Sequence, residues 1–273
     1  EIMPSLVGSE MCIRDRPHIG HVTAAKAAME VLGLDKLVLV PDAQPPHKVL
    51  PEGGAAPRQR YDMAVLATAA LGKRAEVSDM ELRRSGVSYT ADTLAALREQ
   101  YPDLPILLMG HSMGSFLLRT YLYTYPDAVD KAVISGTGWE DPMKVRMGKL
   151  VCKLEQARIG EKNTSALVTK LMFGSYNKAF GPVTSPNAWI CSDDAVVAAY
   201  DADPLCGFDA TVGLARDLLT GVGINEQPEN LDKMNKQLPV LFISGCKDPV
   251  GGMAKGVLKC IDAFKRSGMK DIT

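Results

Sequence analysis

The stretch LPILLMGHSMGSFLLRTYLYT, residues 104–124, constrains the fold more than any other part of this chain. It predicts a short buried strand over residues 105–109, a very tight turn, and a helix that begins near Gly114. The turn has the pattern G-x-S-x-G, which is typical of a nucleophile elbow. We expect Gly110 and Gly114 to permit a bend too sharp for side chains on either side, and the bend to lift the Ser112 hydroxyl out of the sheet. A glycine-rich turn with an idle serine is the alternative.

From this turn onward the sequence GHSMGSFLLRTYLYTYPDAVDKAVISGTG resembles an α/β-hydrolase of the monoacylglycerol lipase or lysophospholipase type. Two later stretches match the same family, AYDADPLCGF at residues 199–208 and LPVLFISGCKDPVG at residues 238–251. The resemblance covers residues 104–273. It implies an α/β fold, with a mostly parallel sheet, helices on both faces and a helical cap over about residues 141–237. It also implies hydrolysis of a carboxylic ester, such as a monoacylglycerol or a lysophospholipid, through an acyl-enzyme and without a cofactor.

A serine hydroxyl becomes a useful nucleophile when a histidine takes its proton and a carboxylate fixes that histidine. In the α/β-hydrolases these residues follow the order serine, acid, histidine. The resemblance therefore assigns Ser112 as the nucleophile and Asp248, just past the strand at residues 238–244, as the acid. It also implies that the amide of Met113 serves as one oxyanion donor.

The sequence lacks a histidine in the position where the family carries its general base. The four histidines are His18, His21, His47 and His111, and none follows Ser112. We expect His111, inside the turn, to point away from the hydroxyl, and the chain to end before the family's histidine. The family's second oxyanion donor, from an early H-G loop, is also missing from the sequence. We therefore expect hydrolysis by this chain to be strongly impaired.

A second resemblance lies at residues 17–103, in the motif H-x-G-H, the loop PPHK and the stretch SYTADTLAALREQYP. Together these resemble a nicotinate-mononucleotide adenylyltransferase, of the HIGH-motif nucleotidylyltransferase superfamily. The resemblance implies ATP and Mg²⁺ as cofactors, with His18, His21 and Lys48 on the ATP phosphates and Gly20 leaving room for the nucleotide. Two histidines at a helix start can also be structural. The family's G-x-F-D-P-type turn and I-S-S-T-x-x-R segment are not found, so we expect this part to be inactive.

The sequence thus predicts three regions, residues 1–16, 17–103 and 104–273. Residues 1–16, EIMPSLVGSEMCIRDR, have no helical or strand periodicity and resemble translated sequencing adaptor; a disordered leader is the alternative. The join falls near residues 101–108, where both families carry a helix, a turn and an apolar strand. An assembly artefact and a natural fusion both explain it, and a chimeric product without activity is a further alternative to either enzyme.

The charge, the cysteines and the apolar runs of the chain limit the classes of partner that we expect. The formal net charge of −1 gives no reason to expect nucleic acid or an anionic membrane surface. The six cysteines include no C-x-x-C pair, which argues against a zinc site and favours a reducing cytoplasm. No apolar run reaches the roughly 18 residues of a spanning helix. We expect a cytoplasmic protein acting on a small lipid or ester, with no metal; the oligomeric state stays open.

Apolar spacing also predicts which side chains face inward. The helix at residues 58–71 is expected to have Met63, Leu66, Ala67 and Ala70 on one inward face, and the helix at residues 90–101 to turn Leu94 and Leu97 inward. The helix after the turn has Phe116, Leu117 and Tyr121 on its apolar face, and residues 131–135 are expected to form a buried strand. A set of large side chains in the cap could line an acyl pocket or be ordinary core: Trp139, Met172, Phe173, Phe180 and Trp189.

Overall fold

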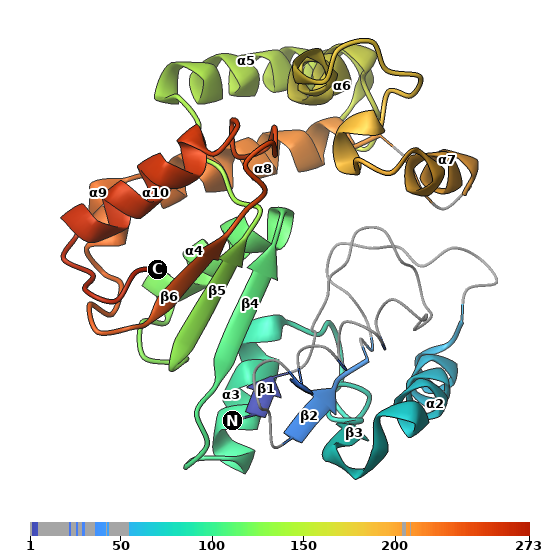
Figure 1. Ribbon diagram of the computed structural model, residues 1–273, viewed down its shortest axis with the longest axis vertical. Helices are drawn as coiled ribbons and strands as arrows, with labels where there is room; N and C mark the ends of the chain where they lie inside the picture. Colours follow the sequence, from blue (N-terminus) through green and yellow to red (C-terminus); the bar gives the residue numbers. More distant parts are fainter. Residues whose placement is uncertain are drawn as a thin grey trace. The chain divides into compact units, whose positions relative to one another are not determined.

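The structure is a computed structural model that describes residues 2–4, 22, 26, 29–30, 36–41, 43, 55–203, 206–207 and 209–273. It divides into two compact units (Figure 1). Unit 1 comprises Glu1–Met109 with Asp127–Ala132, and unit 2 comprises Gly110–Pro126 with Val133–Thr273. Strands flanked by helices make up both, which confirms the predicted α/β class.

Unit 1 contains a three-stranded parallel sheet of order β1-β2-β3, formed by Ile2–Pro4, Lys36–Leu39 and Ala75–Val77. The central strand β2 is buried on both faces. Leu37 packs with Met29, and Val38 packs with Val40 on the other side. Residues 2–4 thus form a strand where the sequence shows no strand periodicity, because three residues are too few for an alternating pattern to register.

The helices of unit 1 are α2 (Pro57–Thr68), the 3₁₀ helix η1 (Ala69–Arg74) and α3 (Thr90–Gln100). Leu94 and Leu97 of α3 are buried, as the spacing predicts. The predicted inward face of α2 is wrong: Leu66 is 76% exposed, and Arg60, Ala64 and Thr68 are buried instead. Arg60 tolerates burial because its guanidinium donates to the carbonyl oxygens of residues 43 and 55.

The second sheet has the order β4-β5-β6, formed by Leu107–His111, Lys131–Ser135 and Val240–Ile243. Near the starts of β4 and β5, the amide of Lys131 donates to the carbonyl oxygen of Ile106. Near their ends, the amide of Ser112 donates to the carbonyl oxygen of Ser135. The two strands are therefore parallel. The described strands form two three-stranded sheets, and β5 matches its predicted bounds residue for residue.

Two long helices of unit 2 pack near this sheet, α4 (Met113–Thr124) and α10 (Lys255–Arg266). Phe264 of α10 meets Phe242 of β6 edge to face, with ring centroids 5.3 Å apart. The predicted inward face of α4 is wrong, since Leu117 is 53% exposed and the helix buries Ser115, Leu118, Arg119 and Leu122.

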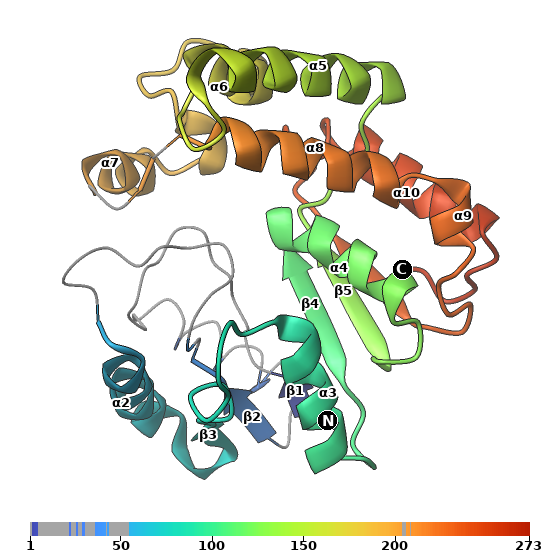
Figure 2. The same cartoon turned by 180° about the vertical axis from the view of Figure 1, so that it is seen from behind.

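The segment between β5 and β6, which contains the predicted cap at about residues 141–237, is mostly helical (Figures 1 and 2). We refer to this segment as the cap. Its helices α5 (Pro142–Ile159) and α8 (Val212–Asn225) lie side by side in both views. A buried cluster joins them through Cys152, Val212 and Ala215, with Val168 of α6. The remaining elements are α6 (Ala166–Phe173), η2 (Tyr176–Ala179), η3 (Ala188–Ile190), α7 (Asp194–Ala202) and α9 (Pro228–Leu231).

Candidate functional site

Ser112 lies at the tip of a strained turn between β4 and α4. Its φ of 52° and ψ of −121° place a non-glycine residue in a region that few side chains tolerate. The residue is exposed, and its amide donates to the carbonyl oxygen of Ser135 at 2.9 Å. The backbone is therefore held at the end of β5 while the hydroxyl stays accessible, as the pattern predicts.

The two glycines of the turn differ in role. A Cβ on Gly110 would lie 2.3 Å from the carbonyl oxygen of Gly114 and 2.9 Å from the Cβ of Leu118. A Cβ on Gly114 would meet no atom within 4 Å. The expectation that both glycines are sterically required is thus confirmed for Gly110, whose Cβ would meet the first turns of α4, and wrong for Gly114, whose Cβ would meet open space.

Met113 is the first residue of α4, directly after Ser112. The first amides of a helix have no carbonyl partner within it, and they carry the positive end of the helix dipole. The Met113 amide is therefore one of the amides at the start of α4 that have no partner within the helix.

Asp248 follows β6, in the loop GCKDPVG. Its Oδ1 accepts a hydrogen bond from the amide of Val250 at 2.9 Å, which orients the carboxylate. Its Oδ2 lies 3.6 Å from the Cβ position of Gly136, the residue that follows β5. Ser112 and Asp248 thus lie at the same ends of strands that flank β5, with the end of β5 between them.

His111 borders this site but does not activate the serine in the structure. Its Nδ1 lies 3.0 Å from the hydroxyl of Ser135, and its Cε1 lies 3.2 Å from the Cβ position of Gly136. Among the described residues the Ser112 hydroxyl has no hydrogen-bond partner. His18, Gly20, His21 and Lys48, the predicted nucleotide-binding residues, lie outside the described residues, as does His47.

Tyr176 has no signature in the sequence, and the structure places it close enough to Asp248 for that carboxylate to act on its pKa. Burial, together with the smaller effect of the negative charges of Glu140 and Asp248, raises the pKa of Tyr176 to about 12. Its ring meets Trp189 edge to face at 5.0 Å, and Trp189 stacks on Phe173 at 5.9 Å. Two of the five predicted pocket side chains thus form one aromatic cluster in the cap.

The other three predicted pocket side chains do not join this cluster. Met172 packs against the buried core of the cap with Cys152 and Val168, so it belongs to that core. Phe180 is 37% exposed. Trp139 lies beside the guanidinium of Arg119, which is 5.8 Å from its ring centroid.

Arg119 is a second residue that the apolar pattern missed. It is fully buried in α4, and its Nη1 donates to the carbonyl oxygen of Gly138, in the loop after β5, at 3.0 Å. Its Nε and Nη2 have no hydrogen-bond partner among the described residues. Burial raises the pKa of nearby Glu226 to about 7, while the Arg119 charge opposes that rise. The Glu226 carboxylate also accepts a hydrogen bond from the amide of Glu140 at 2.7 Å.

Within the described part of the chain, no three histidine, cysteine, aspartate or glutamate side chains gather as a metal site would need. No described helix has both the length and the apolar character needed to cross a membrane.

Comparison with known proteins finds two families in this chain, and the first is a hydrolase family. A thermostable carboxyl esterase from Bacillus coagulans, solved with glycerol, is 27% identical and superposes with a TM-score of 0.58, over 67% of this chain and 60% of the esterase. The family model described as serine aminopeptidase, S33 matches residues 69–273.

Curated relatives match as well. A probable nicotinate-nucleotide adenylyltransferase from Opitutus terrae is 44% identical over 135 residues, 49% of this chain and 67% of the relative. Its counterpart from Aeromonas salmonicida is 38% identical over 143 residues, 51% of this chain and 64% of the relative. The chain thus spans about two thirds of the length of these two relatives, and between 41% and 53% of others of the same name. The adenylyltransferase and hydrolase matches together exceed the chain, so they overlap.

The α/β fold, the exposed serine on a strained turn and the family match agree with one another. The chain therefore belongs to the serine aminopeptidase S33 family of α/β-hydrolases through residues 69–273, and it also carries a fragment of the nicotinate-nucleotide adenylyltransferase family.

Proposed function

We propose that this chain is a serine hydrolase for carboxylic esters, with monoacylglycerols or lysophospholipids as its substrate class. The observation that carries the proposal is the exposed Ser112 on its strained turn, with the Asp248 carboxylate at the end of the same sheet. The similarity to a carboxyl esterase supports an ester as the substrate.

Each residue has a defined part in the proposed reaction. The Ser112 oxygen attacks the ester carbonyl carbon while its proton passes to water, and the C–O bond to the alcohol breaks as the leaving oxygen takes a proton from water. The Met113 amide donates to the oxyanion that forms in the tetrahedral intermediate. Water then hydrolyses the acyl-enzyme and releases the acid. Asp248 is positioned to orient a base between itself and Ser112.

Removal of the proton from the Ser112 hydroxyl is the slow step that we expect for this chain. Within its 273 residues no histidine follows Ser112, and His111 contacts Ser135. Loss of the base from a serine triad costs about a million-fold in turnover, and the oxyanion donors and substrate binding leave a residual rate. We therefore propose that the 273-residue chain hydrolyses esters slowly.

Covalent labelling tests the proposal without requiring fast turnover. The full chain is incubated with a fluorophosphonate probe beside Ser112→Ala and a matched control, Ser115→Ala, whose hydroxyl is buried three residues further on. We expect the wild type and Ser115→Ala to be labelled and Ser112→Ala to be blank. Equal labelling of wild type and Ser112→Ala would remove the serine from the mechanism.

Added imidazole tests the missing base. If the site lacks only a proton acceptor, millimolar imidazole should raise the rate on a p-nitrophenyl ester in the wild type and not in Ser112→Ala. A rate that responds equally in both would mean that imidazole acts on the ester in solution and that the serine plays no part.

The adenylyltransferase similarity favours a second candidate, the transfer of an adenylyl group from ATP to nicotinate mononucleotide with release of pyrophosphate. Incubation with ATP, Mg²⁺ and nicotinate mononucleotide would then yield a dinucleotide, and His21→Ala would lose it. Since the sequence lacks two segments of that family, we expect no product. Failure of both assays would leave the chimeric product without activity as the remaining hypothesis.

A further inference from the structure

The outer side of cap helix α5 carries an exposed apolar stripe. Met143, Met147, Leu150 and Leu154 are 62%, 54%, 50% and 62% exposed. Their spacing of four, three and four residues places them in one row along the helix. We call these four residues the α5 stripe.

The α5 stripe is not needed for the cap core. On the opposite side of the helix Val145 and Cys152 are buried, and Cys152 joins the core cluster with α6 and α8. An amphipathic helix of a globular protein has one apolar face, but α5 has two, and the described residues cover only the inner one. An exposed row of large apolar side chains marks an interaction surface.

Cations flank the stripe on both sides. Five exposed basic residues lie on α5: Lys144, Arg146, Lys149, Lys153 and Arg158. The one acidic residue of the helix, Glu155, is buried and accepts hydrogen bonds from Arg158 and Ser165. Lys144 pairs with Glu140 and Arg158 with Glu155, so Arg146, Lys149 and Lys153 carry the positive charge of the outer face of α5. This face is basic although the whole chain has a formal net charge of −1.

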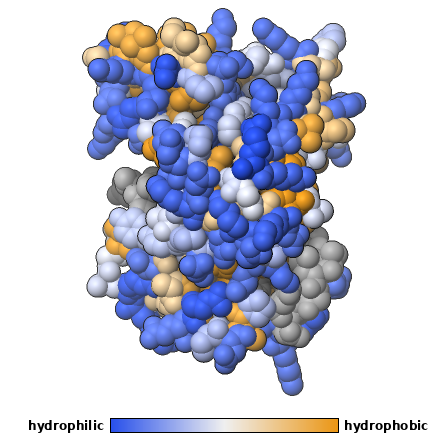
Figure 3. All heavy atoms as spheres, turned by 90° about the vertical axis from the view of Figure 1, so that its left-hand side faces the viewer, coloured by the Kyte–Doolittle hydropathy of each residue, from blue (hydrophilic) through white to orange (hydrophobic). Residues whose placement is uncertain are grey.

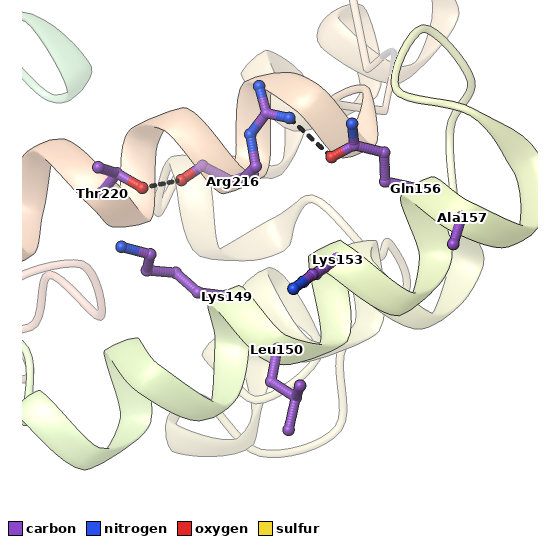
Figure 4. Close-up of a pocket in the computed structure, with 7 residues that line it drawn as sticks. All are labelled: Lys149, Leu150, Lys153, Gln156, Ala157, Arg216 and Thr220. Carbon is purple, nitrogen blue, oxygen red and sulfur yellow. Dashed lines mark hydrogen bonds between the residues drawn. The ribbon is translucent and has the colours of Figure 1, made fainter.

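A groove between α5 and α8 extends the basic surface (Figure 4). It is lined by Lys149 and Lys153 from α5 and by Arg216 and Thr220 from α8, and it borders the stripe at Leu150. Arg216 donates a 2.6 Å hydrogen bond to Gln156 and also pairs with Asp217 and Glu161, so the two lysines supply the positive charge of the groove. Neither lysine has an ion-pair partner within the described part of the chain. The space-filling view shows apolar side chains gathered at the upper end, among hydrophilic ones (Figure 3).

We propose that the outer face of α5 docks on the surface of an anionic phospholipid bilayer. A helix with apolar residues between basic ones lies in the plane of the interface, with the apolar row at the acyl boundary and the cations at the phosphates. Long lysine and arginine side chains reach the phosphates while their stems stay apolar. A second copy of the chain fits this face less well, because it would set one basic surface against another.

Vesicle co-sedimentation of the full chain tests this surface independently of any enzyme activity. Phosphatidylcholine vesicles are compared with vesicles that also contain phosphatidylglycerol, at low and high salt. We expect binding to the anionic vesicles that weakens as salt rises.

Two double variants separate the apolar and the basic contributions. Lys149→Ala with Lys153→Ala should weaken binding about thirtyfold, since each surface cation contributes about 1 kcal/mol, which is about fivefold in affinity. Leu150→Gln with Leu154→Gln should weaken it about tenfold or more. The matched controls are Lys255→Ala with Lys259→Ala on α10 and Leu66→Gln on α2, which remove exposed side chains of the same types elsewhere and should bind as wild type.

Three results would overturn the proposal. They are equal binding to neutral and anionic vesicles, α5 variants that bind as their controls do, and no vesicle binding by a chain that circular dichroism shows to be folded. A dimer in sedimentation velocity that the Leu150→Gln, Leu154→Gln variant loses would assign the face to a second copy.

Discussion

The Cβ position of Gly110 lies 2.3 Å from the carbonyl oxygen of Gly114, so the turn that carries Ser112 has no room for a side chain at residue 110. Alanine at this position must push α4 away from β4. We expect Gly110→Ala to destabilise unit 2 by about 3 kcal/mol or more and to abolish labelling of Ser112. Urea unfolding followed by circular dichroism measures the first effect and the fluorophosphonate probe the second.

Gly114→Ala is the internal control for that change. Its Cβ would meet no atom within 4 Å, and residue 114 lies in the first turn of a helix. Since alanine favours helix by about 1 kcal/mol over glycine, we expect equal or slightly higher stability and unchanged labelling. A loss of stability as large as that of Gly110→Ala would show that the turn differs from the geometry described.

Asn225 of α8 joins the cap to α4, the helix that follows Ser112, and its substitution tests how much this contact stabilises the fold. It is fully buried at the end of α8, where its amide donates to the carbonyl oxygen of Phe116 and its Oδ1 accepts from Thr120, both at 2.8 Å. Asn225→Ala leaves two buried groups of α4 without this partner, so we expect a loss of about 2–3 kcal/mol. Asn187→Ala, which removes an exposed hydrogen bond to Asp201, should cost less than about 0.5 kcal/mol by the same urea unfolding.

The stability of the chain should fall as pH rises toward neutrality because of Glu226. Burial raises its pKa in the folded state to about 7, from an ordinary value of 4.5. The folded state then binds more protons than the unfolded state between these values, so the contribution of Glu226 is fully present below pH 4.5 and is lost as pH rises to 7.

Glu226→Gln isolates that contribution, since the amide oxygen can still accept from the Glu140 amide. Thermal unfolding at pH 5 and pH 8 should give similar melting temperatures for the two proteins at pH 5 and a higher one for the variant at pH 8. A variant that is less stable than wild type at pH 8 would mean that the fold stabilises the ionised carboxylate, which contradicts a raised pKa of Glu226.

Elements with a strong local signature could be predicted from the sequence. The strand, turn and helix around Ser112 follow from an apolar run, two glycines and a second apolar run, and β5 has its predicted bounds. In both cases the residues that define the element are neighbours in the chain. The predicted acid also lies where the pattern puts it, just past β6, because loops after parallel strands meet at one edge of a sheet.

Helix faces were harder to predict, for a physical reason. The spacing assigns Leu66 and Leu117 to the interior, yet both are exposed, while Arg60 and Arg119 are buried. Each arginine is accepted in the interior because its guanidinium donates a hydrogen bond to a carbonyl oxygen from another segment. Such acceptors depend on tertiary structure, so no periodicity in α2 or α4 reveals them. Tyr176 has no sequence signature for the same reason, because the electrostatic effect of Asp248 on its pKa acts between segments far apart in the chain.

The junction of α5 and α6 in the cap gives a final test. Ser165 is buried, its hydroxyl donates to the Glu155 carboxylate at 2.5 Å, and its oxygen accepts from the amide of Val168 at the start of α6. Ser165→Ala removes a helix cap and a charge-assisted hydrogen bond together, so we expect a loss of about 2 kcal/mol. The comparison is Ser175→Ala, at the start of η2, whose side chain makes no capping bond and whose loss should cost less than about 0.5 kcal/mol. Urea unfolding of both variants measures the difference, and equal stabilities would contradict the role given to Ser165 in holding the two cap helices together.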